Sequence, residues 1–308
     1  MQRFGAAIAD GAVDLDQTEL IVVDDGSTDD TADVAGKLLA HLPHHRIVRH
    51  GTNQGKGAAV RTGVSLARGA ATAYMDADMA IDPRAIPLLL DGLRTTDLAI
   101  GSRALSASTV ERTYLLRSLM GRLFNRVVTT GTGLDLLDTQ CGFKALRTPA
   151  ARLLFHLVRI NRFAFDVEVL AQARRLGLTI TEVPVHWRHV PGSTVHPAHD
   201  SVAMLADVFR SRLRTRSRPT VPVATVRRSD GGRLDDDATV QAAIARVLPG
   251  TPLPMLARDC SLLVLFPLVA PPDVEAVLAA LRADLHWTVE LRAVTGREIE
   301  RWGPLTST

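Results

Sequence analysis

The chain has 308 residues, of which 46% are hydrophobic and 4% aromatic, and it carries 36 basic and 33 acidic side chains for a net charge of +3. This composition excludes a largely disordered chain and predicts one large domain and one small one. Because the basic excess is small and aromatic residues are sparse, nucleic acid is not an expected partner.

No uninterrupted apolar run approaches the roughly 20 residues that a membrane-spanning helix needs, and no signal-type segment opens the chain. We therefore expect a soluble or peripheral protein. Cys141 and Cys260 are too far apart in the sequence for a zinc site and give no disulfide framework, which is typical of a reducing cytoplasm.

From residue 19 to residue 101, short β-branched runs alternate with helix-like stretches, which predicts an α/β fold with a mostly parallel sheet wrapped by helices. The expected strands are 20–24, 46–50, 71–76 and 97–102, and the expected helices are 28–42, 57–68 and 83–93. Ligands of open α/β sheets bind at the carboxyl ends of strands, so polar residues at those ends are the candidate site.

A longer amphipathic and basic stretch at 111–130 predicts a helix, followed by helices at 148–158 and 165–176, a strand at 179–188 and a helix at 201–213. The basic helix and the arginine-rich stretch 201–218 are candidates for contact with an anionic membrane surface. A solvated basic linker explains the second stretch equally well.

The composition changes after residue 213, where alternating arginines are followed by prolines and an Asp/Gly-rich run. We expect a first domain at 1–213, a linker at 214–237 and a small α+β domain at 238–308 with helices at 238–248 and 272–285 and strands at 261–268 and 287–293. The last domain carries no motif, and an interaction or regulatory role would rest on composition alone.

The first candidate motif is a buried strand that runs into Asp24, Asp25, Gly26 and Ser27. Two acids at a strand end can accept hydrogen bonds from a base and a ribose, while a glycine permits a tight turn close to a ligand. The alternative is an acidic entry to the next helix.

The second motif, 53–57, is a loop that leads into a helix, with Lys56 between two glycines. Free backbone amides at a helix start favour an anion, and a lysine there can offset the charge of a diphosphate. The spacing is not that of a P-loop, and a solvated turn is the alternative.

The third motif places Asp76, Ala77 and Asp78 at the end of another strand. An acid-x-acid pair can hold a hard divalent ion between protein oxygens and a diphosphate. The alternative is that Asp78 and Asp82 cap the helix that starts near Pro83.

The fourth motif joins the polar stretch 138–144, which includes Gln140 and Lys144, to the stretch 161–168, which includes Asp166 and Glu168. Charged residues that interrupt apolar stretches indicate a functional site, whereas a structural turn with a buried Cys141 is the alternative. A histidine cluster further along is better explained by polar loop residues than by a metal site.

These motifs, in this order, resemble the inverting family 2 glycosyltransferases with a GT-A fold, and most closely the polyprenyl-phosphate sugar synthases of the dolichyl-phosphate β-glucosyltransferase and mannose synthase type. The resemblance covers about residues 3 to 212. It is carried by VVDDGSTDDT at 22–31, NQGKGAAVRTG at 53–63, YMDADMA at 74–80, GSRA at 101–104, DTQCGFKAL at 138–146, RFAFDVEVL at 162–170 and EVPVHW at 182–187.

The resemblance implies a role for each matching residue. It places the nucleotide-sugar at Asp24, Asp25, Gly26, Ser27, Lys56 and Ala77, Mg²⁺ or Mn²⁺ at Asp76 and Asp78, phosphate groups at Arg103 and Arg117, and the sugar and acceptor near Gln140, Lys144, Asp166 and Glu168. The family opens with a further strand that this sequence does not match. Either the start is assigned late or the chain lacks that strand, in which case the strand at 20–24 loses a partner.

The resemblance further implies transfer of a hexose, first of all glucose from UDP-glucose, to a polyprenyl phosphate with inversion, at the inner face of the cell membrane. A lipid phosphate is already ionised, so the attack requires electrostatic help rather than a strong base. GDP-mannose as donor, a soluble acceptor that would need Asp166 as base, and a nucleotide-sugar-binding protein without turnover remain alternatives.

Overall fold

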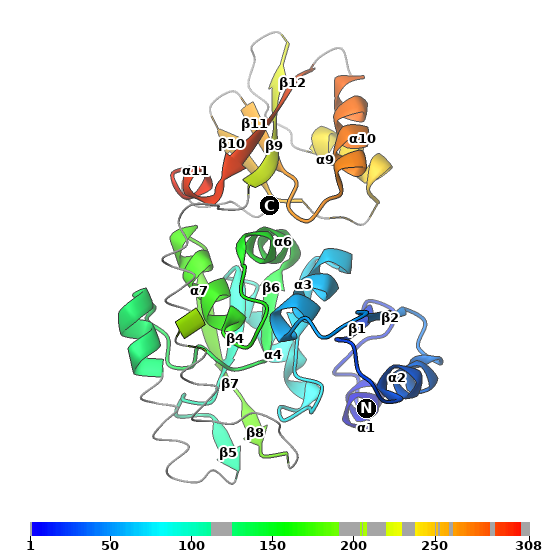
Figure 1. Cartoon of the computed structure of the whole chain (residues 1–308), viewed down its shortest axis with the longest axis vertical. Helices are drawn as coiled ribbons and strands as arrows, with labels where there is room; N and C mark the ends of the chain where they lie inside the picture. Colours follow the sequence, from blue (N-terminus) through cyan, green and yellow to red (C-terminus); the bar gives the residue numbers. More distant parts are fainter. Residues whose placement is uncertain are drawn as a thin grey trace.

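The computed structural model describes residues 2–111, 125–190, 204, 206–207, 220–229, 238–249, 251, 253–258, 261–283 and 287–302. Helix α1 (Gln2–Ala9), strand β1 (Leu20–Asp24), helix α2 (Thr31–Leu39) and strand β2 (His45–Arg49) form the first layer (Figure 1). Strand β1 pairs in parallel with β2 and, within the described residues, with no other strand. The apolar side chains of β1 are half-buried, and Asp24 at its end is buried.

The central sheet has four strands in the order β3 (Ala71–Tyr74), β6 (Lys144–Arg147), β4 (Leu98–Ser102) and β7 (Ile180–Pro184). Strand β6 is antiparallel to both of its neighbours, and β4 and β7 are parallel. Strands β3, β4 and β7 therefore run in one direction and only β6 is reversed, which agrees with the expected, mostly parallel sheet. The sequence pattern missed β6 because a lysine and an arginine flank its two apolar residues.

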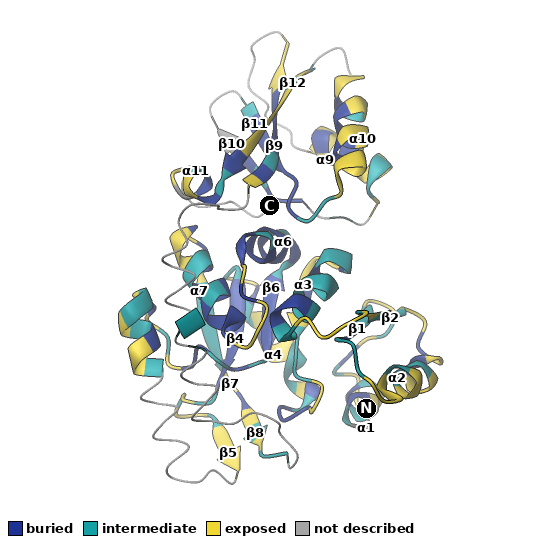
Figure 2. Ribbon diagram, viewed as in Figure 1, coloured by how far each residue is buried: buried dark blue, intermediate teal, exposed yellow. Residues whose placement is uncertain are grey.

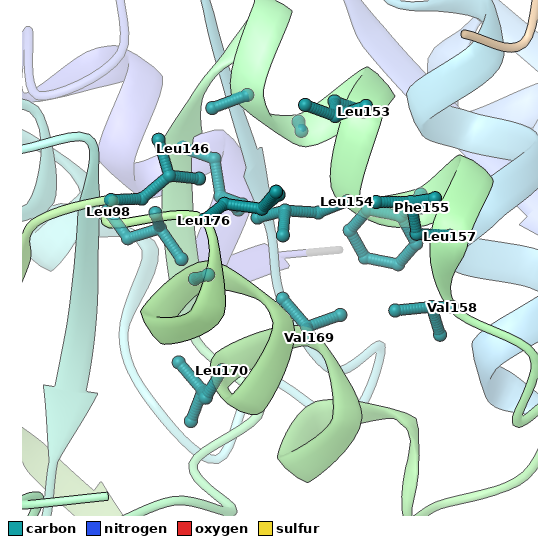
Figure 3. Packing of buried hydrophobic residues seen from close by; sticks show 14 of the residues in the cluster. Leu98, Leu146, Leu153, Leu154, Phe155, Leu157, Val158, Val169, Leu170 and Leu176 are labelled. Carbon is teal, nitrogen blue, oxygen red and sulfur yellow. The ribbon is translucent and has the colours of Figure 1, made fainter. Parts of the chain in front are cut away.

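Helices α3 (Lys56–Leu66), α4 (Ile86–Gly92), α6 (Thr148–Leu157) and α7 (Phe165–Arg175) surround this sheet, and a short turn of 3₁₀-helix (Pro83–Ala85) leads into α4. Their apolar side chains form the main core with those of β4 and β6, as Figure 3 shows for Leu98, Leu146 and Leu154. Helix α6 is buried on nearly every side (Figure 2). A helix that is apolar all round needs cover on both faces, and the second cover comes from the C-terminal part of the chain.

The C-terminal part contains an antiparallel sheet in the order β10 (Met255–Arg258), β11 (Ser261–Leu265), β9 (Thr220–Arg228) and β12 (Trp287–Thr295). Helices α9 (Ala238–Val247) and α10 (Pro271–Arg282) pack on one face of the sheet, and α11 (Gly296–Glu300) follows β12. The expected linker at 214–237 was wrong where it covered β9. Val221 and Val223 are buried on one face of this segment and Val226 on the other, as in a central strand covered on both sides, despite the nearby prolines.

The second face of this C-terminal sheet joins the main core. Val221, Val223, Leu265, Val294 and Ile299 belong to the same buried cluster as helix α6. The described part of the C-terminal unit is therefore continuous with the first domain rather than held by a tether.

His156 of α6 adds two polar contacts to this junction. Its Nδ1 accepts a hydrogen bond from the backbone amide of Leu268 at 3.1 Å, and its Nε2 lies 2.8 Å from the carbonyl oxygen of Thr220. Nδ1 must therefore be unprotonated while Nε2 carries the hydrogen, which requires a neutral imidazole. Burial lowers the pKa of His156 accordingly.

Two short strands, β5 (Thr109–Glu111) and β8 (His186–Arg188), form a separate parallel pair. Strand β5 occupies the start of the helix expected at 111–130, of which residues 125–132 are helical and 112–124 lie outside the described residues. Most of the helix expected at 201–213 also lies outside them. No helix in the described ranges is both long and apolar enough to cross a membrane.

Candidate active site

The acid-x-acid motif forms a tight turn directly after β3. The amide of Met79 donates to the carbonyl oxygen of Asp76 at 3.0 Å, and Met79 has a φ of 51°, in the left-handed region that side chains rarely adopt. Asp78 accepts from the amide of Ala80 at 3.0 Å, so its side chain stabilises this turn. Asp82, and not Asp78, caps the following helix through the amide of Arg84. Ala77 and Asp78 lie exposed at the tip.

Lys56, the first residue of α3, joins the turn to the centre of the domain. Its Nζ lies 2.5 Å from Oδ1 of Asp76 and 4.0 Å from Oδ2 of Asp166. The Asp76 side chain is 42% exposed, whereas that of Asp166 is only 4% exposed. Burial by itself lowers the pKa of Lys56, but the charges of Asp166 and Asp76 outweigh it and the pKa is raised. Lys56 is therefore protonated and lies between the partly exposed carboxylate of Asp76 and the buried carboxylate of Asp166.

Asp166 is held from its other side by two buried donors. Its Oδ1 accepts from Nζ of Lys144 at 2.7 Å and from the Tyr74 hydroxyl at 2.9 Å, and Lys144 also donates to the carbonyl oxygen of Cys141. Burial, reinforced by the charge of Asp166, raises the pKa of Tyr74 well above its usual range, so the hydroxyl stays a donor. Carboxylates and ammonium groups thus alternate along a line from Asp76 to Lys144. The Lys144 side chain is fully buried and contacts protein groups rather than solvent.

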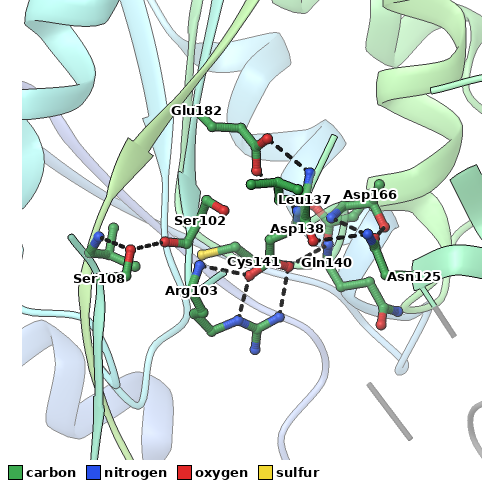
Figure 4. A network of polar contacts seen from close by, with 12 residues as sticks. Ser102, Arg103, Ser108, Asn125, Leu137, Asp138, Gln140, Cys141, Asp166 and Glu182 are labelled. Atoms are coloured by element: carbon green, nitrogen blue, oxygen red, sulfur yellow. Dashed lines mark hydrogen bonds and ion pairs between the residues drawn. The ribbon is translucent and has the colours of Figure 1, made fainter. Parts of the chain in front are cut away.

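Arg103, expected to hold a phosphate group, forms an ion pair with the carboxylate of Asp138. Its Nε and Nη2 donate to the two oxygens of Asp138 at 2.7 and 2.9 Å, and its backbone amide adds a third bond at 3.0 Å (Figure 4). Burial alone would raise the pKa of Asp138, but the bonds and charge of Arg103 lower it. Asp138, to which its motif in the sequence gave no separate role, positions the Arg103 side chain.

The loop that carries Asp138 is fixed from outside the motif. Glu182 of β7 accepts the amides of Leu137 and Asp138 at 2.8 and 3.0 Å. Asn125 accepts the amide and the hydroxyl of Thr139 (Figure 4). The backbone amide of Gln140 donates to Oδ1 of Asp138 at 3.1 Å, and its side-chain Nε2 lies 3.7 Å from Sδ of Met204.

The first motif is occupied by bonds within the protein. Asp24 accepts the amide of Ser27 at 2.9 Å, which with Arg49 at 3.1 Å lowers its pKa. Gly26 has a φ of 76°, and a Cβ there would lie 2.6 Å from the backbone of Thr52. The turn at 24–27 is therefore pressed against the loop at 49–53.

Asp25 holds the same loop further along. Its oxygens accept the amides of Gln54 at 3.0 Å and Gly55 at 2.7 Å and contact Nδ1 of His50 at 2.7 Å. Burial acts to raise the pKa of Asp25, but these hydrogen bonds lower it. Asp25 thus links the first motif to Lys56 and, through it, to Asp76.

Two amides at the start of α3 are occupied within the protein. The amides of Gly57 and Ala58 donate to the carbonyl oxygen of Asn161 at 2.6 and 3.3 Å. Added Cβ atoms at Gly55 and Gly57 would lie 2.5 Å from the Asn161 oxygen and 2.6 Å from the Ile160 oxygen. The two glycines therefore serve the close approach of another backbone segment.

Glu168 fixes that segment rather than lining an open pocket. Its Oε2 accepts the amides of Arg159 and Ile160 at 3.0 and 2.8 Å, and burial raises its pKa in spite of these bonds. Arg61 of α3 donates to the Asn161 side chain at 2.8 Å. Arg61 was not among the predicted site residues, although a charged residue within a small-residue helix is a usable signal.

The structure therefore brings together Lys56, Asp76, Lys144 and Asp166, and connects Asp25 to them. Burial by itself lowers the pKa of Arg103, but the charge and hydrogen bonds of Asp138 outweigh it and raise the pKa, with a smaller contribution from the charge of Asp76. Arg117 lies outside the described residues. Within the described ranges no cluster of three or more acidic, histidine or cysteine side chains is arranged to hold a metal ion by protein groups alone. His186, one of the clustered histidines, pairs with Glu111 at 3.0 Å.

Comparison with known proteins identifies the first part of the chain. Residues 6–154 match the model of Glycosyl transferase family 2. The chain contains a family 2 glycosyltransferase domain. The match spans α1 to α6 and includes both acidic motifs, and with the α/β layers described above it confirms the expected fold class. Asp166 and Glu168 lie after the matched residues but are bonded to the family 2 domain.

Curated relatives extend the similarity past that domain. The chain is 35% identical over 205 residues to a dolichyl-phosphate β-glucosyltransferase of Dictyostelium discoideum, covering 64% of this chain and 63% of the relative. It is 34% identical over 215 residues to the Saccharomyces cerevisiae protein of that name, covering 63% and 64%. The chain thus spans somewhat less than two thirds of the length of these relatives.

Among solved structures, the chain is similar to glucosyl-3-phosphoglycerate synthase from Mycobacterium tuberculosis in complex with Mn²⁺, UDP-glucose and phosphoglyceric acid. The identity is 22%, the TM-score is 0.48, and the similarity covers 63% of this chain and 67% of that one.

Proposed function

We propose that this chain transfers a hexose, glucose from UDP-glucose, to a polyprenyl or dolichyl phosphate with inversion of the anomeric carbon. The observation that carries the proposal is the joined set of Asp25, Lys56, Asp76 and Asp166 within a family 2 domain. Relatives about 35% identical that are named dolichyl-phosphate β-glucosyltransferases support glucose and a lipid phosphate as the substrates.

Asp76 and Asp78 are proposed to hold a divalent ion, Mg²⁺ or Mn²⁺, together with the donor diphosphate. The donor set is hard carboxylate oxygen, and Asp76 already has a cation, the Lys56 ammonium, 2.5 Å from its Oδ1. A Cβ at Gly142 would lie 2.4 Å from Oδ2 of Asp76, so the glycine leaves room for this carboxylate. These features fit a divalent cation, which when bound would take up negative charge on the departing diphosphate.

The remaining groups are proposed to offset the electrostatic repulsion between the donor diphosphate and the acceptor phosphate. Lys56 supplies positive charge on the donor side. Arg103 is held rigidly by Asp138 through Nε and Nη2 while its side chain stays 35% exposed, and with Arg117 it is proposed to hold the acceptor phosphate. Because Asp166 is bound by Lys144 and Tyr74, its task is to place cations, and a lipid phosphate already ionised at neutral pH requires no base.

The test is transfer of label from UDP-glucose into an organic-extractable product with polyprenyl phosphate as acceptor. Parallel assays use GDP-mannose as donor and a soluble phosphorylated acceptor. Asp76→Asn should lower kcat/KM by about 100-fold or more, as loss of a charge group at a reacting centre does. Asp91→Asn, which changes an exposed carboxylate on α4, is the control and should act like the unaltered protein.

Label that enters only a water-soluble product would reject the lipid acceptor. Label taken only from GDP-mannose would reject glucose. We further propose that the protein works at the inner face of the cell membrane, with its basic segments in peripheral contact with anionic lipid, which sedimentation with phosphatidylglycerol vesicles would measure.

A further inference from the structure

Lys56 forms an ion pair with the carboxylate of Asp76, which is also a proposed ligand of the divalent ion. Its Nζ lies 2.5 Å from Oδ1 of Asp76, closer than the 4.0 Å that separates it from Oδ2 of Asp166. A divalent ion and an ammonium group on one carboxylate repel each other, and the repulsion is strong where water is partly excluded. Binding of the ion therefore requires Lys56 to move.

Asp166 offers Lys56 a second position. Its Oδ2 lies 4.0 Å from Nζ of Lys56, while its other oxygen, Oδ1, is engaged by Lys144 and Tyr74. The carboxylate is fixed by those two donors and is 4% exposed. A lysine that leaves Asp76 thus meets a preformed acceptor a short distance away.

The moving partner must be the lysine rather than the aspartate. Asp76 lies against Gly142, where a Cβ would be 2.4 Å from Oδ2 and 2.6 Å from Cγ, so the carboxylate has little space to withdraw. Lys56 has a flexible four-carbon stem, and its Nζ lies 5.8 Å from the centroid of the Phe165 ring, which can stabilise a cation near Asp166.

We propose that Lys56 is an internal counter-cation that neutralises Asp76 in the free protein and transfers to Asp166 when a divalent ion binds. This inference rests on the metal site of the proposed function. It implies that Lys56 competes with the metal, so the free protein binds the ion weakly. It also implies that the charge of Lys56 is kept near the donor after the metal arrives.

The experiment titrates the full chain with Mn²⁺ in the absence of nucleotide and follows free Mn²⁺ by electron paramagnetic resonance. Lys56→Met should tighten Mn²⁺ binding by about tenfold, since a competing cation is removed. Lys37→Met, which removes an exposed lysine from α2, is the matched control and should leave binding unchanged.

Two further variants shift the equilibrium the other way. Lys56→Arg should weaken Mn²⁺ binding, because a guanidinium grips a carboxylate through two bonds. Asp166→Asn should also weaken it, because the second position for Lys56 loses its charge. A cooperative thermal unfolding transition shows that each variant is folded. If Lys56→Met does not fold, the change in Mn²⁺ affinity of Lys56→Arg tests the inference.

The inference is overturned if Lys56→Met binds Mn²⁺ as weakly as the unaltered chain or more weakly, or if Lys56→Arg binds it more tightly. Asp76→Asn separates the inference from its premise. If this variant binds Mn²⁺ unchanged, the metal site and the inference fall together. If the Lys56 variants behave as expected but no sugar is transferred, only the proposed function fails.

Discussion

Replacement of Gly57 by alanine is expected to separate the start of α3 from the segment at 160–161. A Cβ at this position would lie 2.6 Å from the carbonyl oxygen of Ile160, 2.8 Å from Cβ of Phe165 and 3.0 Å from the carbonyl oxygen of Asn161. Two of these atoms belong to the backbone, so no side-chain rotation relieves the clash. The helix or the segment must shift as a whole.

The cost follows from what that shift breaks. The amides of Gly57 and Ala58 would lose their bonds to the Asn161 oxygen, each with a net contribution of about 1 kcal/mol. Overpacking adds about 1–3 kcal/mol, and the better helix propensity of alanine returns at most about 1 kcal/mol. We therefore expect Gly57→Ala to lower the free energy of unfolding by about 2–4 kcal/mol.

Gly63 provides a control within the same helix. A Cβ there would lie 3.7 Å from Cγ2 of Val23, an ordinary contact, so Gly63→Ala should raise the free energy of unfolding by about 0.5–1 kcal/mol through helix propensity. Urea unfolding followed by circular dichroism measures both changes. If Gly57→Ala is as stable as Gly63→Ala, the close approach of the two backbones is wrong.

Two further predictions concern buried charge. Lys144→Met and Asp166→Asn should each lower the free energy of unfolding by about 3–5 kcal/mol, because each leaves a buried charge unpaired. The double variant should lose less stability than the sum of the two single losses. Additive losses in urea unfolding would contradict this pairing. Because burial lowers the pKa of His156 in the folded state, the unfolded state binds the proton at higher pH, so the stability that this neutral imidazole gives is complete above about pH 6.5 and is lost as the pH falls below it. The melting temperature should therefore fall more between pH 8 and pH 5.5 for the unaltered chain than for His156→Gln. The exposed His41→Gln is the control and should fall as the unaltered chain does. Equal falls for the unaltered chain and His156→Gln would refute the stabilising role of the neutral His156 imidazole.

The sequence predicted the elements whose pattern is local. Strand β1 was predicted with its observed bounds, and α6 and α7 to within one residue, because their apolar runs and their flanking residues mark them directly. The acidic turn after β3 was likewise predicted at the end of a strand. The motifs also predicted the family, which the match over residues 6–154 confirmed.

Only the tertiary structure decided what those motif residues contact. The glycines around Lys56 serve the backbone at Asn161, and a spacing along one loop carries no information about a segment that lies a hundred residues later. Strand β6 was hidden because Lys144 is polar in sequence yet buried in an ion pair.

The same reason explains the C-terminal part of the chain. Prolines and arginines near β9 indicated a linker, but Val221 and Val223 of that strand are buried in the same cluster as α6, which is buried on nearly every side and requires a second cover. The local sequence pattern indicates which side chains are apolar and must be buried. Which segment buries them depends on contacts between residues far apart in the chain, and only the tertiary structure shows those contacts.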